Sequence, residues 1–170
     1  MSQQQTRHTL LTKIKNRHDE TAWNDFVSYY EAYIRSLLKT AGVNISEIDD
    51  LLQDVLLKAW RDLPAFEYRP GQCKFRSWLA IMVRNTALTY FKSKNYRTRK
   101  KFQREEGLPD NAFLKSSETE LEKIIKKEWR LYLADLAWQR VAESFSKKVL
   151  KVFLALADGR STEDICSAYE

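Results

Sequence analysis

Turn-forming residues are scarce in this chain of 170 residues. It contains four Gly and three Pro, and 44% of its residues are hydrophobic. Runs that alternate Val, Ile or Thr with polar residues are hard to find. These features favour a packed all-α protein with few tight turns.

Potential metal ligands and targeting segments are also scarce. The two cysteines, Cys73 and Cys166, form no CxxC pair, and both histidines, His8 and His18, lie near the N-terminus. A zinc site is therefore not expected, and neither is any other cofactor. The chain has no apolar run of 18 residues, and its N-terminus lacks the apolar core of a signal peptide. We expect a cytoplasmic protein with reduced thiols and no membrane insertion.

The hydrophobic period divides the chain into two small helical domains joined by a linker. Apolar residues recur at steps of three and four from Thr21 onward. The period is broken in the linker, and Ser117 with Glu120 resembles a capping box that opens the next helix. The expected parts are a flexible segment 1–18, a helical domain 19–103, a linker 104–117 and a helical segment 118–170.

The clearest helix is expected from about Ile48 to Leu63. Ser46 is expected as its N-cap with Asp49 as capping partner, and its apolar stripe includes Trp60. The opposite face is polar except for one leucine, an arrangement that suits docking against another helical element. That face carries Asp50, Gln53, Asp54, Leu57 and Arg61. A lone exposed Leu by itself is ordinary.

All the excess positive charge lies in residues 69–104. This stretch holds eleven Lys or Arg and no Asp or Glu, whereas the rest of the chain has 18 basic and 23 acidic residues. An apolar and aromatic helix pattern runs through it, so the charge belongs to a folded surface. Such a surface suits a polyanion, and the interleaved aromatic residues suggest contacts with bases as well as phosphates.

Two interpretations stay open for the residues around this stretch. Phe66 and Tyr68 could belong to a hydrophobic cluster under a loop, or could stack on unpaired bases. The following helix face could be an ordinary solvated face, or could contact phosphates and base edges. No GxSxG motif and no Gly-rich phosphate loop is present, so an enzyme is not expected.

The run IDDLLQDVLLKAWRDLPAFEYRPGQCKFRSWLAIMVRNTALTYFKSK resembles region 2 of bacterial sigma factors. It is most similar to the compact extracytoplasmic-function (ECF, group IV) sigma factors. The positions that match the family pattern are Asp50-Leu51, Gln53-Asp54, Leu57, Trp60, Phe66, Pro70-Gly71, Phe75-Arg76, Trp78-Leu79 and Arg84-Asn85.

The resemblance implies a non-catalytic specificity subunit of RNA polymerase. Its acidic helix would dock on the clamp helices of the largest polymerase subunit, through Asp49, Asp50, Gln53, Asp54, Leu57 and Arg61. The loop and helix that follow would recognise and melt the −10 element of promoter DNA, through Phe66, Tyr68, Arg69, Lys74, Phe75, Arg76, Arg84, Asn85, Thr89, Lys92 and Lys94. Family members commonly have an anti-sigma factor as a further partner.

Residues 118–170 are similar, less completely, to the start of region 4 of the same family. The runs EWRLYLADLAWQRV and KVFLALADGRSTEDI resemble the opening helices of its helix-turn-helix. The sequence given ends before the turn and the recognition helix that such a module needs, so −35 recognition is expected only with a full region 4. The alternative to a sigma factor is an all-α adaptor with a basic face that binds nucleic acid by charge alone.

Overall fold

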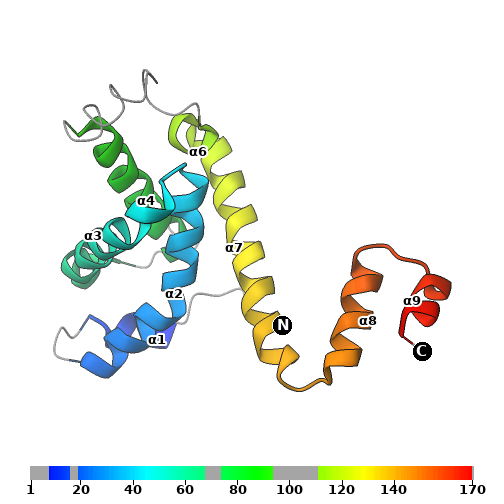
Figure 1. Cartoon of the computed structure of the whole chain (residues 1–170). Helices are drawn as coiled ribbons and strands as arrows, with labels where there is room; N and C mark the ends of the chain where they lie inside the picture. Colours follow the sequence, from blue (N-terminus) through cyan, green and yellow to red (C-terminus); the bar gives the residue numbers. More distant parts are fainter. Residues whose placement is uncertain (1–7, 16–18, 68–73, 94–110, 170) are drawn as a thin grey trace. The chain divides into compact units, whose positions relative to one another are not determined.

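Every regular element in the described part of the chain is a helix. The computed structural model describes residues 8–15, 19–67, 74–93 and 111–169 (Figure 1). The elements are α1 (His8–Lys13), α2 (Glu20–Thr40), η1 (Ile45–Glu47), α3 (Ile48–Asp62), η2 (Leu63–Ala65), α4 (Phe75–Lys92), α6 (Ala112–Lys115), α7 (Glu118–Ala142), α8 (Lys147–Ala157) and α9 (Thr162–Tyr169). The all-α prediction is confirmed. Over these ranges, no helix is long and apolar enough to span a bilayer.

The ends of helix α2 are set by a capping side chain at its start and by a glycine after its end. At its start, the Asp19 carboxylate accepts the backbone N–H of Ala22 at 2.9 Å, satisfying one of the amides that the first turn leaves without a partner. At its end, Gly42 has a φ of 81°, a left-handed conformation that glycine adopts without a steric penalty. These signals are local, which is why the period in the sequence located this helix well.

The start of α3 differs from the expectation. The chain enters this helix through the 3-10 turn η1, so Ser46 lies inside the turn and Glu47 is the residue before α3. Glu47 makes no capping hydrogen bond with its side chain. Asp49, expected as a capping partner, instead accepts a hydrogen bond from Arg35 of α2. The capping prediction at Ser46 is therefore wrong.

Helices α2, α3 and α4 pack together around the core of the first compact unit, Met1–Arg130. Large aromatic and aliphatic side chains fill this core. Among the described residues, the side chains with no exposed surface are Phe26, Tyr30, Tyr33, Ile34, Leu37, Leu38, Ala41, Val55, Ala59, Phe75, Leu79, Ala80, Val83 and Ala87. The core stripes of all three helices thus face one another.

The first unit also includes α6 and the first half of α7. Phe113, Leu121 and Ile125 are buried, and the Trp129 ring lies edge-on to Tyr33 with centroids 5.0 Å apart. The second compact unit is Leu131–Glu170, so the boundary falls inside α7. The sequence analysis placed the linker at 104–117, before this helix. The limits of the functional domains stay a prediction. The described part of the predicted linker, from Asn111, packs within the first unit.

Hydrogen bonds fix this added segment to α2 and α4. Ser36 donates to Glu128 at 2.7 Å, and Ser77 donates to Glu122 at 2.9 Å. At the start of α7, the predicted capping box is formed, because the Ser117 N–H and hydroxyl both donate to Glu120. These bonds hold the pKa of Glu120 below its ordinary value, so the ionised cap is favoured.

Asn111 provides a test of this packing. Its side-chain oxygen caps α6 by accepting the N–H groups of Phe113 and Leu114, and its amide donates to the Thr40 carbonyl at 2.6 Å. We predict that Asn111→Ala destabilises the first unit by about 1–2 kcal/mol, since a cap and a bond to a backbone carbonyl are both lost. Hydrogen exchange of α2 amides measures the change.

The control is a cap in the second unit. Ser146 caps α8 by accepting the Val149 N–H at 3.3 Å, so Ser146→Ala should leave exchange in α2 unchanged. If Asn111→Ala also leaves α2 unchanged, the segment from Asn111 does not stabilise the first unit.

Candidate functional site

The six residues predicted to dock on polymerase all lie on α3 and are all exposed. Asp50, Asp54, Leu57 and Arg61 project to one side of the helix at 100° per residue. Leu57 is 66% exposed and stands at the centre of this face. The structure therefore brings together what the period predicted: a solvent-facing acidic surface with an apolar residue in its middle.

Some charges on this face already have partners. Arg35 donates to Glu31 at 2.8 Å and to Asp49 at 2.6 Å, and these hydrogen bonds raise the pKa of Arg35. Arg61 pairs with its neighbour Asp62, which lowers the pKa of that carboxyl group. Exposed pairs of this kind contribute little to stability, but they hold side chains in defined positions.

The two central carboxylates of the face, Asp50 and Asp54, differ from Asp49 and Asp62 in their hydrogen bonding. No hydrogen bond or ion pair joins Asp50 or Asp54 to another described residue. Both are exposed and project to the same side as Leu57. A cationic side chain of a partner could therefore reach them without displacing an internal contact.

Trp60 belongs to this surface, although the sequence analysis placed it in the core. Its side chain is 42% exposed. At 100° per residue it lies about 60° from Leu57 and about 20° from Gln53, beside the acidic face. The core assignment was wrong because Trp60 sits at the edge of the apolar stripe. The signal that could have found it is its position three residues after Leu57.

The aromatic residues before α4 form a buried cluster. Phe66 is 7% exposed, and its ring centroid is 5.4 Å from Phe75 and 5.0 Å from Trp78. The turn η2 directs it inward, because the Phe66 N–H donates to the Leu63 carbonyl at 3.0 Å. Of the two interpretations, the structure places Phe66 in the hydrophobic cluster.

Burial also describes two residues of the predicted DNA-binding set. Neither Phe66 nor the fully buried Phe75 presents a ring face to solvent. A base could contact either ring only if the cluster rearranged, so the predicted contact of Phe66 and Phe75 with the −10 element stays a prediction. Tyr68 and Arg69 fall outside the described residues.

Helix α4 presents some of the predicted nucleic-acid residues and uses others internally. Lys74, Asn85, Thr89 and Lys92 are exposed, and the last three share one side of the helix at 100° per residue. Arg76 is half-buried. Lys94 lies outside the described residues.

Arg84 has an internal role that the charge pattern did not reveal. Its Nη2 donates to the Leu114 and Ser116 carbonyls at 2.8 and 3.1 Å. These oxygens lie at the end of α6, where a helix leaves carbonyls without partners. Arg84 thus holds the end of α6 against α4. Fewer basic side chains of α4 are therefore exposed to a partner than the sequence suggested.

No cluster of three His, Cys, Asp or Glu side chains that could hold a metal is found among the described residues. The site is therefore described by two surfaces. One is the acidic face of α3, with Asp50, Gln53, Asp54, Leu57, Trp60 and Arg61. The other is the polar side of α4, with Asn85, Thr89 and Lys92.

Residues 26–105 match the protein family described as Sigma-70 region 2. This segment belongs to the Sigma-70 region 2 family. The match contains both surfaces, α3 and α4, together with the turn between them.

Two curated relatives are ECF sigma factors. The chain is 31% identical over 97 residues to the ECF RNA polymerase sigma-E factor of Haemophilus influenzae, covering 57% of this chain and 49% of the relative. It is 34% identical over 77 residues to the ECF RNA polymerase sigma factor SigG of Mycobacterium tuberculosis, covering 43% of this chain and 20% of the relative. The chain thus aligns with half or less of the length of these relatives.

A solved structure is also similar. It is the NMR structure of an engineered region 2 of sigmaE in complex with GTAAAA, with 29% identity over 62% of this chain and 100% of that chain. The TM-score is 0.43.

Proposed function

We propose that this chain acts as a sigma factor of the ECF type, directing bacterial RNA polymerase to promoters. The observation that carries the proposal is the exposed α3 face with Leu57 at its centre, inside a segment of the Sigma-70 region 2 family. The named relatives, both ECF RNA polymerase sigma factors, support the same role. The chain would supply specificity and no bond-making chemistry.

The acidic face of α3 is proposed to dock on the clamp helices of the largest polymerase subunit. Leu57 and Trp60 would supply the apolar centre of the contact, and Asp50 with Asp54 would supply charge that attracts a basic partner. Interfaces commonly combine an apolar centre with a polar rim in this way. Charge at the rim mainly speeds the encounter, whereas the buried centre sets the lifetime of the complex.

The polar side of α4 is proposed to hold the −10 promoter element after strand separation. Asn85 offers an amide for base edges, and Lys92 offers a cation for phosphate. Lys74 lies before the first turn of the same helix and adds a second exposed cation. Tyr68, Arg69 and Lys94 stay within the proposal as neighbours in the sequence.

The segment 118–170 is proposed to contribute to −35 recognition where a full region 4 is present. Its helices α8 and α9 would then be the opening part of a helix-turn-helix, and α9 carries no basic residue in its last turn. An anti-sigma factor is a further proposed partner, as the family resemblance implies.

Two substitutions on α4 test the function against a charge-driven adaptor. With the chain bound to core polymerase, we predict that Lys92→Ala weakens binding to every single-stranded DNA sequence equally and reduces the salt slope by about 0.7. Asn85→Ala should remove about 1–3 kcal/mol of discrimination between −10-like and scrambled sequences. Fluorescence anisotropy over a salt series measures both effects.

The adaptor predicts a different pattern. Binding would follow charge alone, so the wild-type chain would show no preference among sequences and Asn85→Ala would change nothing. Lys126→Ala is a matched control: Lys126 is an exposed lysine on α7, outside both surfaces, so we expect little change in binding or in sequence preference.

A further inference from the structure

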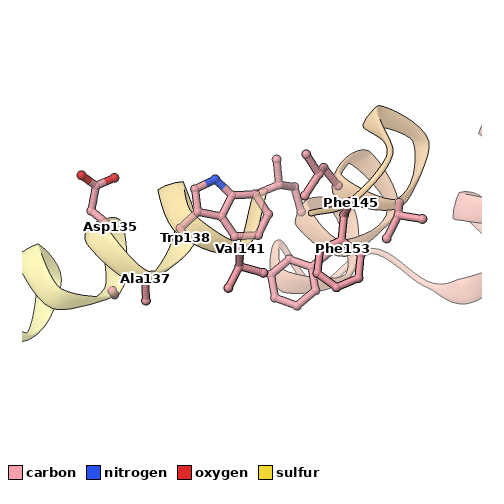
Figure 2. A pocket seen from close by; sticks show the side chains of 10 residues that line it. Asp135, Ala137, Trp138, Val141, Phe145 and Phe153 are labelled. Atoms are coloured by element: carbon pink, nitrogen blue, oxygen red, sulfur yellow. The ribbon is translucent and has the colours of Figure 1, made fainter. Parts of the chain in front are cut away.

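Two features of the described residues lie outside the proposed surfaces. One is an apolar groove of about 780 Å³ between the last part of α7 and α8, in the second unit (Figure 2). Trp138, Val141 and Phe153 are among the side chains that line it. None of the described residues covers this groove, and nothing in the structure shows what would. The other feature is a hydrogen bond that joins α3 to α4 inside the first unit, and this bond bears on the proposed function.

A lysine of α3 is bonded to a buried threonine of α4. The Lys58 ammonium donates to the Thr86 hydroxyl at 2.9 Å. Thr86 is 3% exposed, and its hydroxyl donates its own proton to the Met82 carbonyl at 2.9 Å. A hydroxyl has one proton and two lone pairs, so the proton is used within α4 and a lone pair is left for Lys58. Both groups are therefore satisfied by one geometry.

The ammonium group of Lys58 also lies near the end of its own helix. Hydrogen bonds from Arg61 lower the pKa of Asp62, and the nearby charge of Lys58 adds to this effect. Lys58 is itself half-buried. The side chain is therefore held between the end of α3 and the middle of α4.

This bond lies directly behind the two proposed surfaces. Lys58 follows Leu57, the exposed centre of the acidic face, and Thr86 follows the exposed Asn85 of α4. One step along a helix turns the side chain by about 100°, so each partner of the bond points away from the surface residue beside it. The helix that carries the docking face and the helix that carries the DNA-facing side are thus joined by a direct polar contact.

A hydrogen bond fixes the register of two helices more closely than apolar packing does. Apart from Thr86, the buried residues of α3 and α4 are apolar. Apolar burial is non-directional, whereas a hydrogen bond needs a donor and an acceptor at a set distance and angle. The bond from Lys58 therefore specifies how far along α4 the end of α3 lies. Removal of either partner leaves the other one without its bond, which is costly in a buried site.

We propose that Lys58 and Thr86 are positioning residues that set the spacing between the docking face of α3 and the DNA-facing side of α4. The inference rests on the proposed function and adds a coupling between its two partners. Polymerase would hold α3 and DNA would hold α4, so both can bind in full only if the spacing between these helices is kept. Loss of the bond leaves each surface intact and weakens the cooperation between the partners.

Titration of the labelled chain with core polymerase, with and without a saturating −10-like single strand, tests the proposal. In the wild type the DNA should tighten polymerase binding, and the factor of tightening measures the coupling. Lys58→Met keeps an unbranched apolar side chain and removes the ammonium group. We expect its Kd for polymerase alone to stay within about twofold of the wild type, because Leu57 is unchanged. The factor gained with DNA should fall about tenfold, since a hydrogen bond from a charged group is lost.

Further variants show whether the bond itself is responsible. Thr86→Val removes the acceptor and should give the same loss of coupling, and the double variant should lose no more than either single change. Thr86→Ser keeps a hydroxyl and should keep the wild-type coupling. Lys39→Met is the matched control: Lys39 is an exposed lysine of α2, so the same loss of charge there should change neither Kd.

The possible failures are distinct. An equal gain from DNA in the wild type and Lys58→Met would overturn the positioning role. A loss of affinity that is the same with and without DNA would also overturn it, because a local folding defect gives that result. A wild-type chain that binds polymerase but gains nothing from DNA would remove the coupling and leave the docking role in place. If the wild type does not bind polymerase at all, the proposed function itself is overturned, and the coupling with it.

Discussion

Leu57→Asp should abolish tight binding to core RNA polymerase while the chain stays folded. Leu57 is exposed, so the substitution adds a carboxylate at the surface and removes no core contact. In the proposed complex the same carboxylate would be buried in the apolar centre of the interface, without a partner. A central position of this kind costs roughly 2 kcal/mol or more, which weakens the complex at least about 30-fold. Titration of labelled chain with core polymerase measures it.

The matched control is Ile45→Asp. Ile45 is 84% exposed on η1, before α3 and outside the acidic face, so the same chemical change there should leave polymerase affinity within about twofold. Equal affinity for wild type and Leu57→Asp would remove the docking role from α3. A loss with both variants would indicate a general charge effect and would favour the adaptor.

Phe66→Ala is expected to destabilise the first unit by about 3–5 kcal/mol. The ring is buried against Phe75 and Trp78, so its removal leaves a cavity that the neighbouring rings fill only in part. Small domains are stable by about 5–15 kcal/mol, so this loss is a large part of the total. Urea denaturation followed by circular dichroism gives the change in unfolding free energy.

The measurement separates a core residue from a base-binding residue. Leu57→Ala, which also removes a large apolar side chain, should change stability by no more than about 0.5 kcal/mol because that side chain is at the surface. If Phe66→Ala unfolds at the wild-type urea concentration, its ring does not contribute to the core. Slow promoter opening by that variant would then be evidence for direct contact with a base.

The distribution of roles between α3 and α4 follows from their neighbours. Helix α3 packs only one side against the core and leaves the acidic face outward. Helix α4 is covered on more of its circumference, because Ser77 and Arg84 bond to α7 and to the end of α6. The basic stretch therefore offers fewer exposed side chains to a partner than its number of Lys and Arg residues implied.

The amino-acid sequence by itself determined the features that depend on neighbours along the chain. The all-α class, the extent of α2, the capping box at Ser117 and the outward position of Leu57 follow from spacing, caps and the scarcity of Gly and Pro. Each depends on residues within about one or two helical turns, where propensity and periodicity operate. The region 2 pattern is also continuous in sequence, and for that reason the resemblance could be stated from the residues.

Only the tertiary structure decided the features that depend on distant segments. Phe66 is buried because η2 folds it under α4, and Arg84 is an anchor because α6 brings its carbonyls within reach. Trp60 is exposed because none of the described helices covers the edge of the stripe on which it lies. The boundary inside α7 arises because Trp129 fits against Tyr33, nearly a hundred positions away in the chain. Periodicity within one helix carries no information about which surface of another helix will cover it.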